Sequence, residues 1–192
     1  KLKLIYYLIM ETVKLIQNNK VIKNAVIIFL GTILLTISAK VKIPFYPVPM
    51  TMQTFVVIFL GMCFGYKLGL TTVALYLIEG IVGIPVFSNS PEKGVGMIYF
   101  TGPTMGYLLG FIIAVYVAGK FNFNKNYLLN FIKIFFSVIP IYLLGLLWLG
   151  ILIGWDKPIF DLGAKPFLLA ELFKIFLLVI ISTKVDFFKK FI

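Results

Sequence analysis

Two ionisable side chains stand three residues apart in an apolar stretch near the C-terminus. Glu171 and Lys174 lie within residues 167–183, a run that carries no other charged side chain. On translocon scales a charged residue at the centre of a membrane helix costs roughly 2.5–3.5 kcal/mol, so such residues are candidate functional sites. Residues i and i+3 of a helix share nearly one face, about 4.5 Å apart along its axis. The spacing therefore predicts an acid and a base directed into one place.

The overall composition predicts an all-α membrane protein. Of the 192 residues, 61% are hydrophobic and 13% are charged, and the mean hydropathy is +1.05. A soluble domain of this composition would leave too much apolar surface in water. We therefore expect one integral membrane domain over residues 1–192.

Six apolar runs approach the roughly 20 residues that cross about 30 Å of hydrocarbon. They predict a bundle of six transmembrane helices within residues 25–183, with approximate bounds 25–39, 54–64, 70–85, 103–120, 134–154 and 167–183. The N-terminal segment, residues 1–20, begins with lysines before an apolar run but has no small-residue cleavage site. Residues 4–16 of this segment predict a helix that lies at the membrane interface.

The lysines are unequally divided between the two predicted sides of the membrane. Twelve fall on the side that holds both termini, and five fall on the other side. By the positive-inside rule the N- and C-termini are then cytoplasmic, as an even number of helices requires. We attribute the formal net charge of +11 to this topology and to attraction for anionic membrane lipid, and we predict no nucleic-acid partner.

The residue types exclude most enzyme chemistry. The chain has no histidine and a single cysteine, Cys63, which excludes His-based catalytic dyads and triads, most metal sites and an internal disulfide. It also lacks a P-loop motif for a nucleotide. We predict no enzyme activity, no metal and no cofactor. The alternative is an intramembrane enzyme that uses Glu79, Glu171 and Lys174 as acid and base.

Further polar residues collect where apolar runs meet the predicted outer loops. Three prolines within six residues stiffen the first such loop and exclude a helix there. The loop is either a rigid turn or a lid over an outward pocket with the Gln53 amide at its floor. Counted from Pro85, Glu79 lies about 9 Å below the outer end of its predicted helix. Counted from residue 167, Glu171 and Lys174 lie about 6 and 10 Å below the outer end of theirs, so the three side chains have similar depths. Glu79 either lines a shared cavity or pairs with Lys174 as structural glue.

Two stripes of small residues predict close helix packing. Glycines at positions 102, 106 and 110 recur every four residues, and we expect this stripe to pack inside the bundle. The second stripe lies on the first predicted helix, needs a neighbour in this chain or in another, and consists of Ala25, Gly31, Thr32, Thr36 and Ala39. Tyrosines near the predicted helix ends, Tyr142 among them, predict an interfacial aromatic belt.

Taken together, these motifs resemble the BioY family, the biotin-binding S components of energy-coupling factor (ECF) transporters. The matching segments occur in order along the chain and are 47–54, 83–87, 102–104, Gly106 with Tyr107, Gly110 with Phe111, and Glu171 with Lys174. Each motif is weak alone, but their order and the six predicted helices make the match specific. Where the family usually has Asp this chain has Glu171, and where it often has Arg in the third loop this chain has Lys93.

The resemblance implies a six-helix substrate-capture subunit in a bacterial plasma membrane. Such a subunit docks on a transmembrane coupling protein that two ATPase subunits drive, and it carries biotin as its ligand without a cofactor. The small-residue face of the first helix is similar to the docking surface of these subunits, which assigns partner docking to Ala25, Gly31, Thr32 and Thr36.

The resemblance also implies a set of ligand-binding residues. They are Glu171, Lys174, Gln53, Glu79, Lys93, Phe87 and Tyr107. The ureido ring of biotin has two N–H donors and a carbonyl acceptor, which suit a carboxylate and an ammonium on one helix face. Its valerate carboxylate would bind Lys93 or Gln53, and its apolar atoms would contact Phe87 and Tyr107.

Two alternatives remain besides the intramembrane enzyme. The chain is an S component for another vitamin, or it is a structural membrane subunit in which the pair of Glu171 and Lys174 only sets the helix register. Binding of a vitamin panel separates the first alternative from biotin capture. The second predicts that loss of Lys174 impairs folding but leaves ligand affinity intact.

Overall fold

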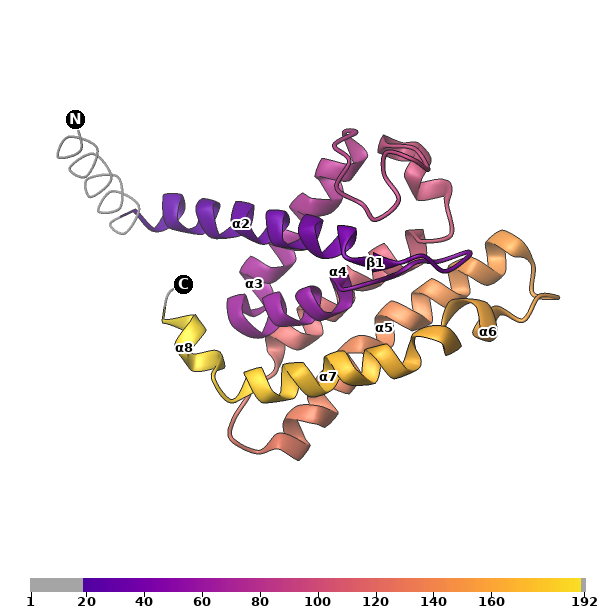
Figure 1. The fold of residues 1–192 in the computed structure, drawn as a ribbon. Helices are drawn as coiled ribbons and strands as arrows, with labels where there is room; N and C mark the ends of the chain where they lie inside the picture. Colours follow the sequence, from indigo (N-terminus) through magenta and orange to yellow (C-terminus); the bar gives the residue numbers. More distant parts are fainter. Residues whose placement is uncertain (1–18, 191–192) are drawn as a thin grey trace.

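The computed structural model describes residues 19–190 and is built almost entirely from helices (Figure 1). The helix expected over residues 4–16 lies outside this part of the chain. The five longer helices are α2 (Lys20–Lys40), α3 (Gln53–Ile81), α4 (Met105–Lys120), α5 (Tyr127–Ile153) and α7 (Leu168–Ser182). The shorter elements are α6 (Ile159–Gly163), α8 (Val185–Lys189), and the 3₁₀ segments Gly96–Thr101 and Lys165–Phe167. Strands β1 (Lys42–Ile43) and β2 (Met50–Thr51) form an antiparallel pair.

Helix α3 is a hairpin of two arms that turns at Gly65. The φ and ψ angles of Gly65 are 71° and 175°, a combination that is essentially restricted to glycine. The side chains of Gln53 and Tyr76 are hydrogen-bonded at 2.8 Å although they are 23 residues apart. A straight helix would separate them by about 35 Å. The two arms therefore correspond to the predicted helices 54–64 and 70–85, except that the second ends at Ile81.

Two of the three glycines in the predicted stripe bring α4 and α5 together. A Cβ on Gly106 would meet the Leu144 carbonyl, and one on Gly110 would come within 2.6 Å of the Ile141 Cα, so α4 and α5 pack closely at both points. Gly102 does not belong to this stripe, because it precedes α4 and ends the 3₁₀ segment before it.

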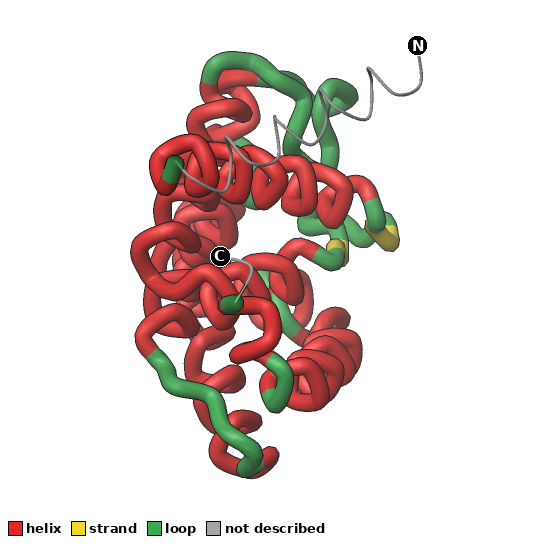
Figure 2. Tube along the Cα trace, turned by 90° about the vertical axis from the view of Figure 1, so that its left-hand side faces the viewer, coloured by secondary structure: helices red, strands yellow, loops and turns green. Residues whose placement is uncertain are grey.

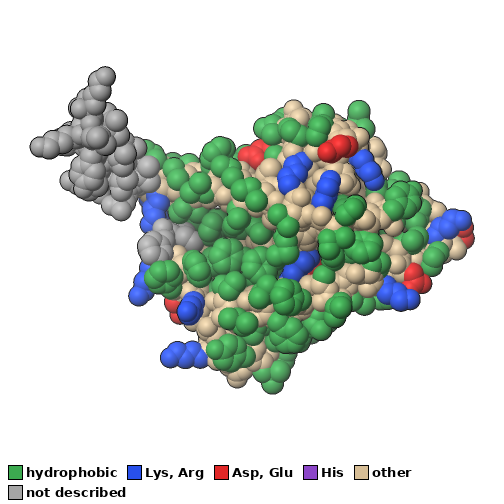
Figure 3. All heavy atoms as spheres, viewed as in Figure 1, with side chains coloured by type: hydrophobic (Ala, Val, Ile, Leu, Met, Phe, Trp, Pro, Cys, Tyr) green, Lys and Arg blue, Asp and Glu red, His purple; other side chains and the backbone are tan. Residues whose placement is uncertain are grey.

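The outside of the bundle is apolar. Large side chains on α2, α5 and α7 are exposed, among them Phe29, Leu143 and Phe173. Hydrophobic side chains cover most of the face in Figure 3, and lysines gather at its left end and along its upper and right margins. Helices α2 and α5 are each long and apolar enough to cross a membrane, and α3 reaches that length only over its two arms taken together. The chain is therefore a helical membrane protein, while six crossings and the side of the termini stay predictions.

The two ends of the bundle differ. Both ends of the described chain lie at the left in Figure 1, and Figure 2 views the bundle from that side. Three connections lie at the opposite end, where the strand pair sits beside the start of α7. They are 41–52, which we call the proline-rich loop, 82–104, which we call the third loop, and 154–167. Of the polar residues that the sequence singles out, Lys93 lies in these connections, whereas Gln53, Glu171 and Lys174 lie in the first turns of the helices that follow them.

Candidate binding site

Glu171 and Lys174 form a buried ion pair on one face of α7. Their residues are 5% and 4% exposed, and Lys174 Nζ lies 3.1 Å from Glu171 Oε2. The predicted i, i+3 geometry is confirmed. Because two charges lose much of their hydration in such a place, the pair needs further hydrogen bonds to be stable there.

Those hydrogen bonds come from two other helices and from β2. Lys174 Nζ donates to Thr51 O at 2.7 Å and to Thr54 Oγ1 at 2.9 Å. Glu171 Oε2 accepts from Thr54 Oγ1 at 2.9 Å and from Tyr142 OH at 3.0 Å. The three ammonium protons therefore have three acceptors, and Thr54 both accepts from the base and donates to the acid. We call Glu171, Lys174, Thr51, Thr54 and Tyr142 the ion-pair network.

The proline-rich loop supplies the Thr51 carbonyl to this network. Lys42 pairs with Thr51 and Ile43 with Met50 in the short β1–β2 ladder, and Met52 N donates to Ser38 O at 3.3 Å. The loop is non-helical as predicted, but the strand pair was not foreseen. It holds Thr51 O against α7.

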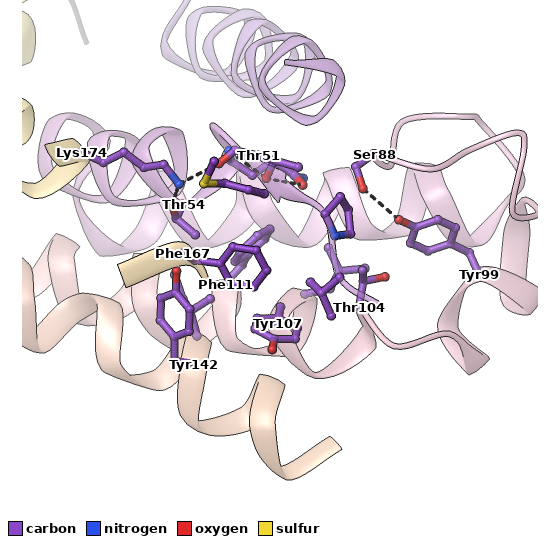
Figure 4. A pocket seen from close by; sticks show the side chains of 16 residues that line it. Thr51, Thr54, Ser88, Tyr99, Thr104, Tyr107, Phe111, Tyr142, Phe167 and Lys174 are labelled. Atoms are coloured by element: carbon purple, nitrogen blue, oxygen red, sulfur yellow. Dashed lines mark hydrogen bonds between the residues drawn. The ribbon is translucent and has the colours of Figure 1, made fainter. Parts of the chain in front are cut away.

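A small cavity lies between this loop, the third loop, the first turns of α3 and α4, the middle of α5 and the first part of α7 (Figure 4). We call it the loop cavity; it is lined by Val48, Pro49, Met50, Thr51, Gln53, Thr54, Ser88, Tyr99, Thr104, Tyr107, Leu108, Phe111, Ile141, Tyr142, Phe167 and Lys174. Polar groups line one side, and aromatic and aliphatic groups line the other. Its volume is about 50 Å³, whereas ligand pockets usually measure roughly 300–1,000 Å³. In this structure the cavity is therefore too small for a ligand that needs a pocket of that size.

Of the predicted binding residues, Gln53, Tyr107 and Lys174 line the loop cavity directly. Gln53 Nε2 donates to Tyr76 OH at 2.8 Å, and Tyr76 OH donates to Val86 O at 3.0 Å. This relay connects the amide at the cavity floor to the third loop. Tyr107 OH donates to Gly163 O at 2.7 Å, which fixes its ring in the wall.

Phe87 was expected in the wall of the binding site, but it does not line the loop cavity. It is 1% exposed and packs against the rings of Tyr76, Tyr99 and Phe100, with ring centroids 4.7–5.5 Å apart. Its ring occupies the space that Gly80 leaves free by lacking a Cβ. Phe87 therefore supports Tyr99 from behind, and Tyr99 is the residue that reaches the cavity.

Glu79 and Lys93 lie away from the loop cavity. The predicted depth of Glu79 was counted from Pro85, but the helix ends at Ile81, which places Glu79 about 3 Å from that end. Its side chain makes no ion pair within residues 19–190, so it is not the partner of Lys174. Lys93 is exposed, and its Nζ lies 5.8 Å from the centre of the Tyr46 ring.

Two lysines that the sequence analysis did not single out fasten the third loop. Lys40 Nζ donates to Phe87 O and Ser90 O, both at 2.7 Å. Lys42 Nζ donates to Ser88 O at 2.6 Å and to Asn89 Oδ1 at 3.2 Å. In the sequence, only their position next to the three prolines could have indicated that Lys40 and Lys42 have a structural role. Together they hold Ser88 over the loop cavity.

Tyr142, Thr51 and Thr54 were also missed. Tyr142 was expected in the interfacial belt, but its hydroxyl bonds Glu171 inside the bundle. Thr51 and Thr54 flank Gln53 in the proline-rich motif, and this position was the signal that could have identified them.

The expected docking face on α2 is partly used within the chain. Gly31 and Thr32 are buried, and a Cβ on Gly31 would lie 2.5 Å from Thr72 Cγ2 of α3. Gly31 therefore packs against α3, and Thr32 is also buried in this structure. Ala25 is exposed and Thr36 is half-buried.

Comparison with known proteins agrees with this architecture. The model of the BioY family matches residues 10–190. A probable biotin transporter BioY of Pyrococcus horikoshii is 34% identical over 164 residues, which cover 85% of this chain and 96% of that protein. The biotin transporter BioY of Thermotoga maritima is 33% identical over 157 residues, which cover 80% and 89%.

A solved structure has the same fold. The crystal structure of the S-component for biotin from an ECF-type ABC transporter superposes with a TM-score of 0.73 at 23% sequence identity, over 88% of this chain and 93% of that chain. With the family match over nearly the whole described chain, the conclusion is direct: this chain belongs to the BioY family of membrane transport proteins.

Proposed function

We propose that this chain captures biotin in the loop cavity as the S component of an ECF-type uptake transporter. As a member of the BioY family it is a transport protein and not an enzyme. The observation that carries the proposal is the buried ion-pair network, whose Lys174, Thr51, Thr54 and Tyr142 border the cavity.

The hydrogen-bond donors and acceptors that line the cavity suit the ureido ring. Lys174 Nζ is a charged donor for the ring carbonyl, which would take the place of Thr51 O. The oxygens of Thr54 and Gln53 are acceptors for the ring N–H groups. Glu171 does not line the cavity but bonds Lys174, Thr54 and Tyr142 from behind. It therefore acts as the counter-charge that orients these groups.

Entry of the ligand requires the loops to move. The loop cavity of about 50 Å³ has no room for a molecule of two fused rings and a valerate chain. Outward displacement of the proline-rich loop would break the bond from Lys174 to Thr51 O and free one ammonium proton for the ligand. Closure after binding would then exclude water from the charged pair.

Biotin titration of the purified protein, alongside other vitamins, tests the proposal. We expect saturable binding of biotin and none of thiamine or riboflavin. Tight binding of one of these without biotin would overturn the proposal in favour of another S component. A Lys174→Ala variant that folds poorly but keeps full affinity would favour a structural subunit.

The proposal extends to transport in a bacterial plasma membrane. The chain would cross six times with both termini cytoplasmic and deliver biotin inward with a transmembrane coupling protein and two ATPase subunits. The lysine distribution and the relatives' names support this part. Uptake of labelled biotin by cells that express the chain with and without the coupling proteins tests delivery.

The orientation can be tested with single cysteines. Lys125 and Lys157 are exposed at opposite ends of α5, while the native Cys63 is buried. In intact cells a membrane-impermeant maleimide should label the Lys157→Cys variant and spare the Lys125→Cys variant until the cells are opened. The reverse pattern would place the loop cavity on the cytoplasmic side.

A further inference from the structure

A second cavity, which we call the lateral hollow, lies between α5 and α7. Its volume is about 490 Å³, which is within the range of small-molecule sites. Its walls are aliphatic and aromatic side chains of α5, α6 and α7, and two of its rim residues, Leu143 and Leu168, are 54% and 49% exposed. In a protein that lies in a membrane, such an opening faces lipid.

The floor of the lateral hollow is polar at one point. Tyr142 and Glu171 are the two polar residues among its lining. The Tyr142 hydroxyl is already committed to Glu171 Oε2, which also accepts from Thr54 and Lys174. Glu171 Oε1 accepts no hydrogen bond within residues 19–190. Because a carboxylate oxygen has two lone pairs, this buried residue presents an unfilled acceptor beside an apolar wall.

The hollow also continues along the seam between the two helices. On α5 its lining extends from Leu146 to Phe135, a length of about 16 Å. A second apolar depression on the same seam is lined in part by Phe131 and Phe176, whose ring centroids are 5.6 Å apart. A single hydrocarbon chain that starts at Glu171 therefore has an apolar wall of about 16 Å along α5 within the hollow, with a separate apolar depression further along the same two helices.

We propose that the lateral hollow binds a single-chain membrane lipid with a hydroxyl head, whose O–H donates to Glu171 Oε1. An ionised fatty acid is disfavoured because its carboxylate would face that of Glu171. A double-chain lipid would have to place its second chain outside the hollow. The occupant is thus a neutral amphiphile such as a monoacylglycerol, and its binding does not depend on biotin being the ligand of the loop cavity.

Native mass spectrometry of the purified protein tests this with monooleoylglycerol and with methyl oleate, which lacks the hydroxyl. Retention of monooleoylglycerol should exceed that of methyl oleate about tenfold, the effect of one hydrogen bond to a charged acceptor. Leu172 lines the hollow, whereas Leu169, on the same helix, is 82% exposed and does not. Leu172→Trp should abolish retention, and Leu169→Trp should leave it unchanged.

Equal retention of the two compounds, or equal retention by the two variants, would overturn the proposal. So would a dimer of this chain that Leu172→Trp disrupts, because a second copy would then occupy the hollow. Biotin titration of the same samples keeps the two proposals separate: a parent protein that retains monooleoylglycerol but does not bind biotin contradicts only the proposed function.

Discussion

The loop cavity and the lateral hollow lie against the same ion pair but differ in size and in their walls. The loop cavity is small, has a polar side and lies between two loops and the helices; the lateral hollow is about ten times larger, almost wholly apolar and lies between two helices. All three acceptors of Lys174 lie towards the loop side or within the pair. A charged pair can therefore serve a polar ligand on one side while it lies against hydrocarbon on the other.

Removal of one charge of the ion pair should have the largest effect on stability and on biotin affinity. Lys174→Met leaves Glu171 buried and unpaired, which we expect to cost about 3–5 kcal/mol of stability and more than about 100-fold in biotin affinity. The double variant Glu171→Leu/Lys174→Met replaces the pair by apolar side chains and should recover most of the stability but none of the affinity. Thermal unfolding and titration measure both. Recovery of affinity in the double variant would contradict a ligand-binding role for the pair.

A smaller change should weaken only the loop side. Thr54→Val removes the hydroxyl that links Lys174 to Glu171 and lines the loop cavity, and we expect about a tenfold loss of biotin affinity. Thr71→Val is the matched control, since the Thr71 hydroxyl bonds only the Lys67 carbonyl of its own helix. Retention of monooleoylglycerol should be similar in both variants. An equal loss of biotin affinity in the control would show a general effect on α3.

Release of the third loop should change rates more than affinity. In the double variant Lys40→Met/Lys42→Met, the bonds to the carbonyls of Phe87, Ser88 and Ser90 are lost. We expect biotin to dissociate about fivefold faster and amide exchange over residues 86–90 to increase. The control is Lys157→Met, which removes an exposed ammonium that pairs with the exposed Asp156 away from the third loop. Unchanged dissociation would mean that Lys40 and Lys42 do not govern closure.

Removal of a charge on the outside of the bundle should have the smallest effect on stability and on biotin affinity. The exposed Asp161 accepts a 2.7 Å hydrogen bond from Lys165, which raises the pKa of Lys165 above its ordinary value of 10.5. A raised lysine pKa contributes stability below that ordinary value and loses it only at higher pH. Because both side chains are exposed, Asp161→Asn should lower the melting temperature only slightly and by the same amount throughout about pH 6 to 9, and it should leave biotin affinity unchanged. A pH-dependent loss in that interval would contradict this assignment.

Local patterns in the sequence predicted the helices and the central pair well. Apolar runs located the helical segments, and the i, i+3 spacing placed Glu171 and Lys174 on one face. Glycine spacing also identified the contact of α4 with α5 through Gly106 and Gly110. These features depend on neighbours a few residues away, which a single sequence records directly.

Features that depend on distant segments were missed or misplaced. The strand pair joins residues seven and nine positions apart, and the bonds of Lys40 and Lys42 reach 46 to 50 residues along the chain. The end of a helix was misjudged by four residues, and this error alone moved Glu79 to a false depth. Phe87 was assigned to the wall because its loop is near, but which side of that loop faces the cavity is decided by packing on Gly80.

The positive φ angle of Gly65 decides whether the chain runs through the bundle an even or an odd number of times. A continuous helix over residues 53–81 would pass once through a bilayer, and everything after it would then be inverted relative to α2. Because Gly65 reverses the chain, the later helices return the C-terminal end to the side from which α2 starts (Figure 1). One backbone conformation available to glycine thus decides which way α4, α5 and α7 point, and with them the end of the bundle at which the ion pair lies.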